Sequence, residues 1–133
     1  MVELGGTVVA DARASLRVLE TSHPPVYYLP EAAFAAGSLQ AAPGSSYCEF
    51  KGTATYLDVV AGSVTAARAG WCYPRPDPGF EALTGHVALY PGLMDRVTVA
   101  GEVVRPQEGG FYGGWITDRV VGPFKGGPGT RGW

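Results

Sequence analysis

The fold class is decided by residues 52–73, which read GTATYLDVVAGSVTAARAGWCY. Two runs rich in β-branched and aromatic residues, 52–60 and 64–73, flank the break Ala61-Gly62-Ser63. Such residues favour strands, and a short break that contains glycine favours a hairpin turn. The stretch therefore predicts an antiparallel β-hairpin.

The second strand of this hairpin has two chemically different faces. Trp71 and Tyr73 alternate with Gly70 and Cys72, and successive side chains of a strand point to opposite sides of a sheet. Because large rings lose the most water on burial, we expect Trp71 and Tyr73 to point inward. Cys72 is then expected on the opposite side.

The rest of the chain predicts further short elements and little helix. We expect antiparallel pairing within 7–20, 53–73 and 87–100, a loop at 41–46, and helix only near 30–36 and 78–84. The predicted hairpins outside 52–73 join 7–11 to 15–20 and 87–90 to 96–100, and residues 26–29 form a further strand. The expectation is a mainly β, single compact antiparallel domain.

The last quarter of the chain differs in composition from the rest. Residues 108–133 are rich in glycine and carry the rings Phe111, Tyr112, Trp115, Phe124 and Trp133. Flexible linkers combine glycine with serine rather than with aromatic residues. We therefore expect a β domain over 1–107 and an extended tail over 108–133 that docks on the domain or on a partner.

Charge and hydropathy exclude several classes of function. A net charge of −2 gives no electrostatic attraction to nucleic acid or to an anionic membrane. No apolar run approaches the roughly 20 residues that span a bilayer, and the first residues, MVELGGTVVAD, lack the pattern of a signal peptide. We expect a cytoplasmic protein without nucleic-acid or membrane partners.

Metal and phosphate motifs are absent from the sequence. The potential zinc ligands Cys48, Cys72, His23 and His86 include no C-x₂-C or H-x₃-H pair, so we expect no metal site and no cofactor. The segment KGGPGT at 125–130 lacks the spacing and the strand-to-helix context of a phosphate-binding loop.

Glu20 is the leading carboxylate for catalysis. It ends the run SLRVLE on the face that Leu16 and Val18 share, which we expect to point inward. A desolvated carboxyl group has a raised pKa and can serve as a general acid or base. The alternative is a structural carboxylate held by backbone amides or by an arginine.

Cys48 precedes Lys51 and Gly52 at the start of a predicted strand. A nearby ammonium group would lower the pKa of the thiol and favour a nucleophile. No histidine base is adjacent in the sequence, and most such cysteines are small packing residues. Both roles remain open.

Four large rings are spread over three predicted strands: Tyr28, Tyr56, Trp71 and Tyr73. Brought together, they would line an apolar pocket with a few polar groups, as in many small-molecule sites. The alternative is that they are simply the hydrophobic core of a small domain.

Several strings of the sequence together resemble one family. They are TVVADA followed by LRVLET, PPVYYLP, C-x-x-K-G-x-A-x-Y, AGWCYPRP and VALYPGLMDRVTV. The chain is similar to DUF427, a family of bacterial domains also labelled nucleotidyltransferase-like 9. The resemblance implies a compact β fold of the Mss4-like or β-tent barrel type and no established activity. The family pattern falls on Glu20, Pro25, Tyr28, Pro30, Cys48, Lys51, Gly52, Tyr56, Trp71, Tyr73 and Pro76.

The resulting hypothesis is a β domain whose cavity binds a small polar or aromatic metabolite. The expected lining is Glu20, Tyr28, Lys51, Tyr56, Trp71 and Tyr73. One alternative is an enzyme with Glu20 as acid or base or with Cys48 as nucleophile, assisted by Lys51. Another is an interaction module that uses the aromatic tail to hold a partner or a second copy of the chain.

Overall fold

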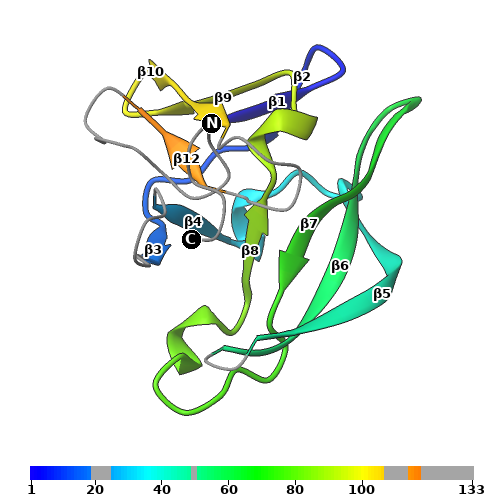
Figure 1. The fold of residues 1–133 in the computed structure, drawn as a ribbon. Helices are drawn as coiled ribbons and strands as arrows, with labels where there is room; N and C mark the ends of the chain where they lie inside the picture. Colours follow the sequence, from blue (N-terminus) through cyan, green and yellow to red (C-terminus); the bar gives the residue numbers. More distant parts are fainter. Residues whose placement is uncertain (19–24, 49–50, 107–113, 118–133) are drawn as a thin grey trace, which may run out of the picture.

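The computed structural model describes residues 1–18, 25–48, 51–106 and 114–117, with the backbone alone for 46–48. The fold is mainly β, as the sequence predicts (Figure 1). The strands are β1 (Val2–Leu4), β2 (Thr7–Ala10), β3 (Leu16–Val18), β4 (Val26–Pro30), β5 (Leu39–Cys48), β6 (Gly52–Ala61), β7 (Val64–Cys72), β8 (His86–Leu89), β9 (Arg96–Val99), β10 (Glu102–Val103), β11 (Arg105–Pro106) and β12 (Trp115–Ile116).

Helix is confined to single turns of 3-10 type. They are η1 (Glu31–Ala33), η2 (Glu81–Leu83) and η3 (Pro91–Leu93). The first two lie in the segments 30–36 and 78–84, where the sequence predicts short helices. Within the described ranges, no helix has the length and hydrophobicity needed to cross a bilayer.

The strands form open antiparallel sheets. One sheet has the order β3-β4-β8-β7-β6-β5, a second has the order β10-β9-β1-β2, and β11 pairs with β12. Strands β5, β6 and β7 form a long curved arm at one side of the fold (Figure 1), and the turn between β6 and β7 lies close to Gly5, between β1 and β2. The described strands do not close into a barrel.

The hairpin predicted at 52–73 is confirmed as β6 and β7. Val60 pairs with Thr65 and Ala61 with Val64 around the turn. The strict alternation predicted for β7 is interrupted at Arg68, which has a φ of 51°. Ala67 is consequently exposed, although strict alternation would place it on the inner face with Trp71 and Tyr73.

Three other local predictions are wrong, and in each case the residues pair in a way that the sequence does not predict. β2 pairs with β1 and β3 with β4, so 7–11 and 15–18 form no hairpin. β8 lies between β4 and β7, whereas β9 pairs with β1 and β10 in the other sheet. The predicted loop 41–46 is part of β5, an edge strand, where proline is tolerated because its missing N–H faces no neighbour.

The six-stranded sheet is buried on both faces near its centre. Its β8 residues Val87, Ala88 and Leu89 are all 0% exposed. Val87 and Leu89 belong to a first core, which the four-stranded sheet covers, and Ala88 to a second core on the other face. The second core contains Tyr28 and Tyr73, two of the four rings that the sequence analysis singles out, and Trp71 packs against it.

Candidate functional site

The second core is built around Tyr28, Trp71 and Tyr73, which come from β4 and from the end of β7. The ring of Tyr28 lies 6.3 Å from that of Trp71, edge to face, and 6.3 Å from that of Tyr73. The indole Nε1–H of Trp71 donates to the hydroxyl of Tyr28 at 3.3 Å. The structure therefore brings together three of the rings that the sequence predicts for the site.

Tyr56 extends this group on β6. It is the Cα partner of Trp71 in the β6–β7 pair, and the guanidinium carbon of Arg68 lies 4.3 Å from its ring centroid. We call Tyr28, Tyr56, Trp71, Tyr73 and Tyr90 the aromatic cluster.

Tyr90 is the member of the aromatic cluster that the sequence analysis missed. It follows β8 directly, and its ring lies 4.6 Å from that of Trp71. Burial chiefly, and then the nearby Tyr56, raise the pKa of Tyr90, while Arg68 lowers it. The sequence does hold a signal for Tyr90, because this residue directly continues the apolar strand His86–Leu89. The sequence analysis predicts that this strand pairs with 96–100, however, and not with β4 and β7.

The rings of the aromatic cluster differ in exposure. Tyr28 is 2% and Tyr73 is 6% exposed, so these two are parts of the protein interior. Tyr56, Trp71 and Tyr90 are half-buried. The cluster thus has a closed base and an outer layer that solvent reaches.

Lys51 immediately precedes β6 and is 7% exposed. Its carbonyl oxygen accepts the backbone N–H of Asp77 at 3.0 Å, so the chain that leaves Tyr73 passes close beside it. At Gly52 a Cβ would lie 3.2 Å from the carbonyl oxygen of Arg75, at a φ of 105°. Glycine is therefore required there for the close backbone approach.

The two proposed catalytic side chains cannot be placed in this geometry. Glu20 lies outside the described residues, and for Cys48 the backbone alone is described, as the Cα partner of Gly52. Their roles, and that of Lys51, remain sequence predictions.

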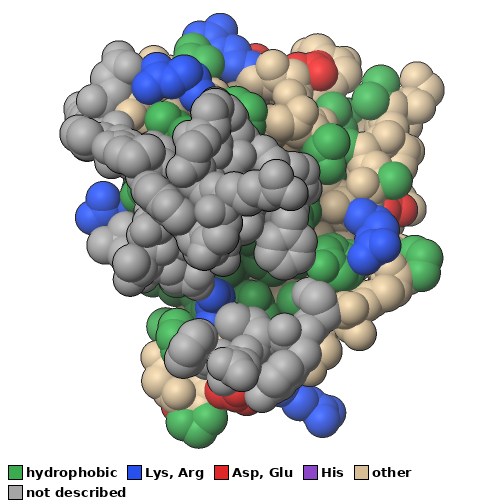
Figure 2. Space-filling view, in the orientation of Figure 1, with side chains coloured by type: hydrophobic (Ala, Val, Ile, Leu, Met, Phe, Trp, Pro, Cys, Tyr) green, Lys and Arg blue, Asp and Glu red, His purple; other side chains and the backbone are tan. Residues whose placement is uncertain are grey.

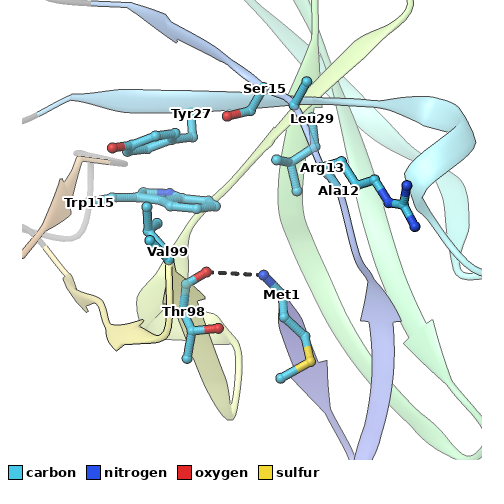
Figure 3. A pocket seen from close by; sticks show the side chains of 11 residues that line it. Met1, Ala12, Arg13, Ser15, Tyr27, Leu29, Thr98, Val99 and Trp115 are labelled. Atoms are coloured by element: carbon cyan, nitrogen blue, oxygen red, sulfur yellow. Dashed lines mark hydrogen bonds between the residues drawn. The ribbon is translucent and has the colours of Figure 1, made fainter.

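A separate pocket lies beside the first core (Figure 3). It has a volume of about 360 Å³ and is lined in part by Arg13, Tyr27, Leu29, Thr98 and Trp115. In Figure 3 the rings of Tyr27 and Trp115 lie together on one side of the hollow and Arg13 on the other. The two rings stack at 4.9 Å between centroids.

Cys72 lies in a further hollow, of about 400 Å³, which it shares with Glu31, Phe34 and Leu57. The side chain packs against the first core, on the opposite side from Trp71, as predicted. Burial, and secondarily the charge of Glu31, raise the pKa of the thiol above its usual value. These factors disfavour the thiolate and hence nucleophilic chemistry at Cys72.

Metal-ligating groups do not gather in the described part of the chain. No set of three or more His, Cys, Asp or Glu side chains is placed to hold an ion there. His86 has a local contact instead, with its Nδ1 3.0 Å from the carbonyl oxygen of Thr84.

Comparison with known proteins gives one family. A search of curated proteins found no match to the chain. A family model, described as a domain of unknown function (DUF427), matches residues 1–100. This range includes the described strands of both large sheets up to β9 and all five residues of the aromatic cluster. The chain therefore belongs to the DUF427 family.

Proposed function

We propose that the protein binds a small polar or aromatic metabolite against the aromatic cluster. The observation that carries this proposal is the convergence of five rings from β4, β6, β7 and the end of β8, three of them half-buried. A cluster that served only as core would gain most by burying every ring completely. The half-buried rings of Tyr56, Trp71 and Tyr90 favour a surface that a ligand completes.

The chemistry of the aromatic cluster suits a flat ligand with polar substituents. Tyrosine and tryptophan offer π faces for stacking, and their hydroxyl and indole groups can form directional hydrogen bonds. Small-molecule sites commonly combine such apolar walls with a few fixed polar groups. Lys51 and Glu20 are the polar groups that we propose for the end of the site nearest the start of β6.

Native mass spectrometry of freshly purified protein tests this function. We expect a noncovalent adduct of small mass, released when the protein is denatured. Trp71→Leu removes the half-buried ring but keeps an apolar side chain, so we expect this variant to lose the adduct. The matched control is Tyr27→Leu, which alters a ring on the opposite face of the same sheet and should retain it.

Two results would contradict the proposal. One is an adduct that Trp71→Leu retains and Tyr27→Leu loses, because the ligand would then sit beside Trp115. The other is wild-type protein that carries no adduct and whose melting temperature is unchanged by a panel of aromatic carboxylates, nucleosides and nucleotides. Circular dichroism of both variants checks that the β fold is intact.

A further inference from the structure

We propose that Arg68 forms an anion-binding subsite at the edge of the aromatic cluster, so that the ligand carries a carboxylate, sulfonate or phosphate group beside its planar body. This inference rests on the proposed function and specifies the class of ligand. Three features of the structure support it: the backbone at Arg68, the position of its guanidinium group, and the phenol groups around it.

The backbone of β7 is distorted at Arg68. Leu57 pairs with Gly70 and Val59 with Ala66, so Asp58 alone faces the three residues 67–69. This is a β-bulge, and Arg68 within it has a φ of 51°, a left-handed conformation that is unfavourable for a non-glycine residue. The Asp58 carboxylate accepts the backbone N–H of Arg68 at 2.8 Å and so holds the bulge.

Bulges redirect side chains, and functional sites are where strained residues gather. Here the redirected guanidinium lies over the ring of Tyr56, at 4.3 Å from its centroid. On another side it approaches Gly44 of β5, where a Cβ would stand 3.1 Å from a guanidinium nitrogen. Gly44 thus leaves room for Arg68 between the edge strand and the ring.

This placement leaves the guanidinium able to bind an anion. A cation–π contact engages the flat face of the group and, among the described residues, leaves its in-plane N–H donors available. The Asp58 carboxylate is engaged by the backbone amide of Arg68. The Arg68 residue is exposed, whereas the rings beside it are half-buried.

The neighbouring Tyr90 adds a neutral donor. Both Tyr56 and Arg68 influence the pKa of Tyr90 electrostatically, so the three groups lie close together. The raised pKa of Tyr90 keeps its hydroxyl protonated at neutral pH. A guanidinium fork with a phenolic O–H group nearby suits a carboxylate or a phosphate group. On the described part of the face shown in Figure 2, basic side chains stand at several separate places, most of them near the outline, which fits recognition of a small anion by one group.

Two fluorescent probes of nearly the same shape test the subsite. They are 8-anilinonaphthalene-1-sulfonate, which is anionic, and N-phenyl-1-naphthylamine, which has no sulfonate. We expect Arg68→Met to weaken binding of the sulfonate about tenfold or more, as loss of a charged hydrogen bond does, and to leave the neutral probe within about twofold. Methionine is as strained as arginine at this φ, so the bulge is perturbed equally in both proteins.

Controls locate the effect. Arg17→Met removes an exposed charge from β3 and should change neither affinity. Trp71→Leu should weaken both probes and Tyr27→Leu neither.

The outcomes separate this inference from the proposed function. If Arg68→Met weakens neither probe, or weakens both equally, the anion subsite is wrong while binding at the aromatic cluster stands. If the wild-type protein binds neither probe, or if Trp71→Leu changes neither affinity, the cluster is not an accessible site and both proposals fail.

Discussion

Tyr27 and Tyr28 are neighbours in β4, yet they belong to two different regions of the molecule. Tyr27 points to the first core and stacks on Trp115 at 4.9 Å. Tyr28 points to the second core and meets Trp71 edge to face at 6.3 Å. Each tyrosine thus has a tryptophan partner, one on either face of the same sheet.

The two tryptophans are held in different ways. Trp115 is 2% exposed, and its Nε1–H donates to the backbone carbonyl oxygen of Leu89 at 3.2 Å. Trp71 is half-buried and donates to a side-chain hydroxyl, that of Tyr28. In the first region Trp115 is buried and anchored to the backbone, although a pocket lies beside it, whereas in the second region Trp71 is partly open and joined through a side chain. This difference is why we place the function in the second region.

The largest expected effect on stability comes from truncating the buried Trp115 of the first region. Trp115→Ala should lower the free energy of unfolding by about 3–5 kcal/mol, as large core truncations do. Trp71→Ala should cost clearly less, because part of its ring already contacts solvent. Urea denaturation measures both. Equal losses would mean that the two regions are equally structural.

Gly70→Ala should destabilise the strand pair that both regions share. A Cβ there would lie 3.1 Å from the carbonyl oxygen of Ala88 and 3.1 Å from the Leu89 side chain. We expect a loss of about 1–3 kcal/mol from overpacking. Gly92→Ala is the control, since its Cβ would meet only Pro106 at ordinary contact distance. A thermal melt that showed no difference between the two variants would contradict the close packing of β7 on β8.

Removing the hydroxyl group should have different effects at Tyr28 and at Tyr27. Tyr28→Phe deletes the acceptor of the Trp71 indole and should cost about 1 kcal/mol. Tyr27→Phe should cost little, because the contact seen for Tyr27 is through its ring. Denaturant titration of the two variants, with tryptophan fluorescence as a second signal, measures the two losses of stability. A larger loss for Tyr27→Phe would reverse our assignment.

Replacing Arg68 by glycine should affect the stability of the protein and its binding of the anionic probe differently. Arg68→Gly removes a non-glycine residue from a φ of 51° but also its contact with Tyr56. We expect the free energy of unfolding to rise by at most about 1 kcal/mol while the preference for the anionic probe disappears. A clear loss of stability would show that the arginine side chain, rather than Asp58, holds the bulge.

The smallest effect concerns Cys72, on the opposite face from Trp71. Because burial and Glu31 raise the pKa of its thiol, alkylation by iodoacetamide should be slow at neutral pH and accelerate only in more alkaline solution than for a free cysteine. Glu31→Gln should lower that pKa slightly and speed the reaction by a small factor. Peptide mass spectrometry follows the site, and fast labelling at neutral pH would contradict this.

Local pattern was enough to predict the β class, the hairpin β6–β7 and four rings of the aromatic cluster. These follow from side-chain type and from alternation along a strand, which depend on neighbouring residues alone. The same local information placed Cys72 and Trp71 on opposite faces. It also indicated Glu20, Cys48 and Lys51 as functional side chains, and their roles stay predictions.

Outside the β6–β7 hairpin, tertiary structure alone decided which strands pair. Alternation states which residues share a face but not which strand lies alongside, so β8 and β9 were predicted as one hairpin although they belong to different sheets. That choice brings Tyr90 onto Trp71. The bulge is likewise invisible in the sequence of β7, because it arises from register against β6 and from the carboxylate of Asp58. Arg68 and Tyr90 join the site through contacts between distant segments, and such contacts leave no periodic signal in either segment.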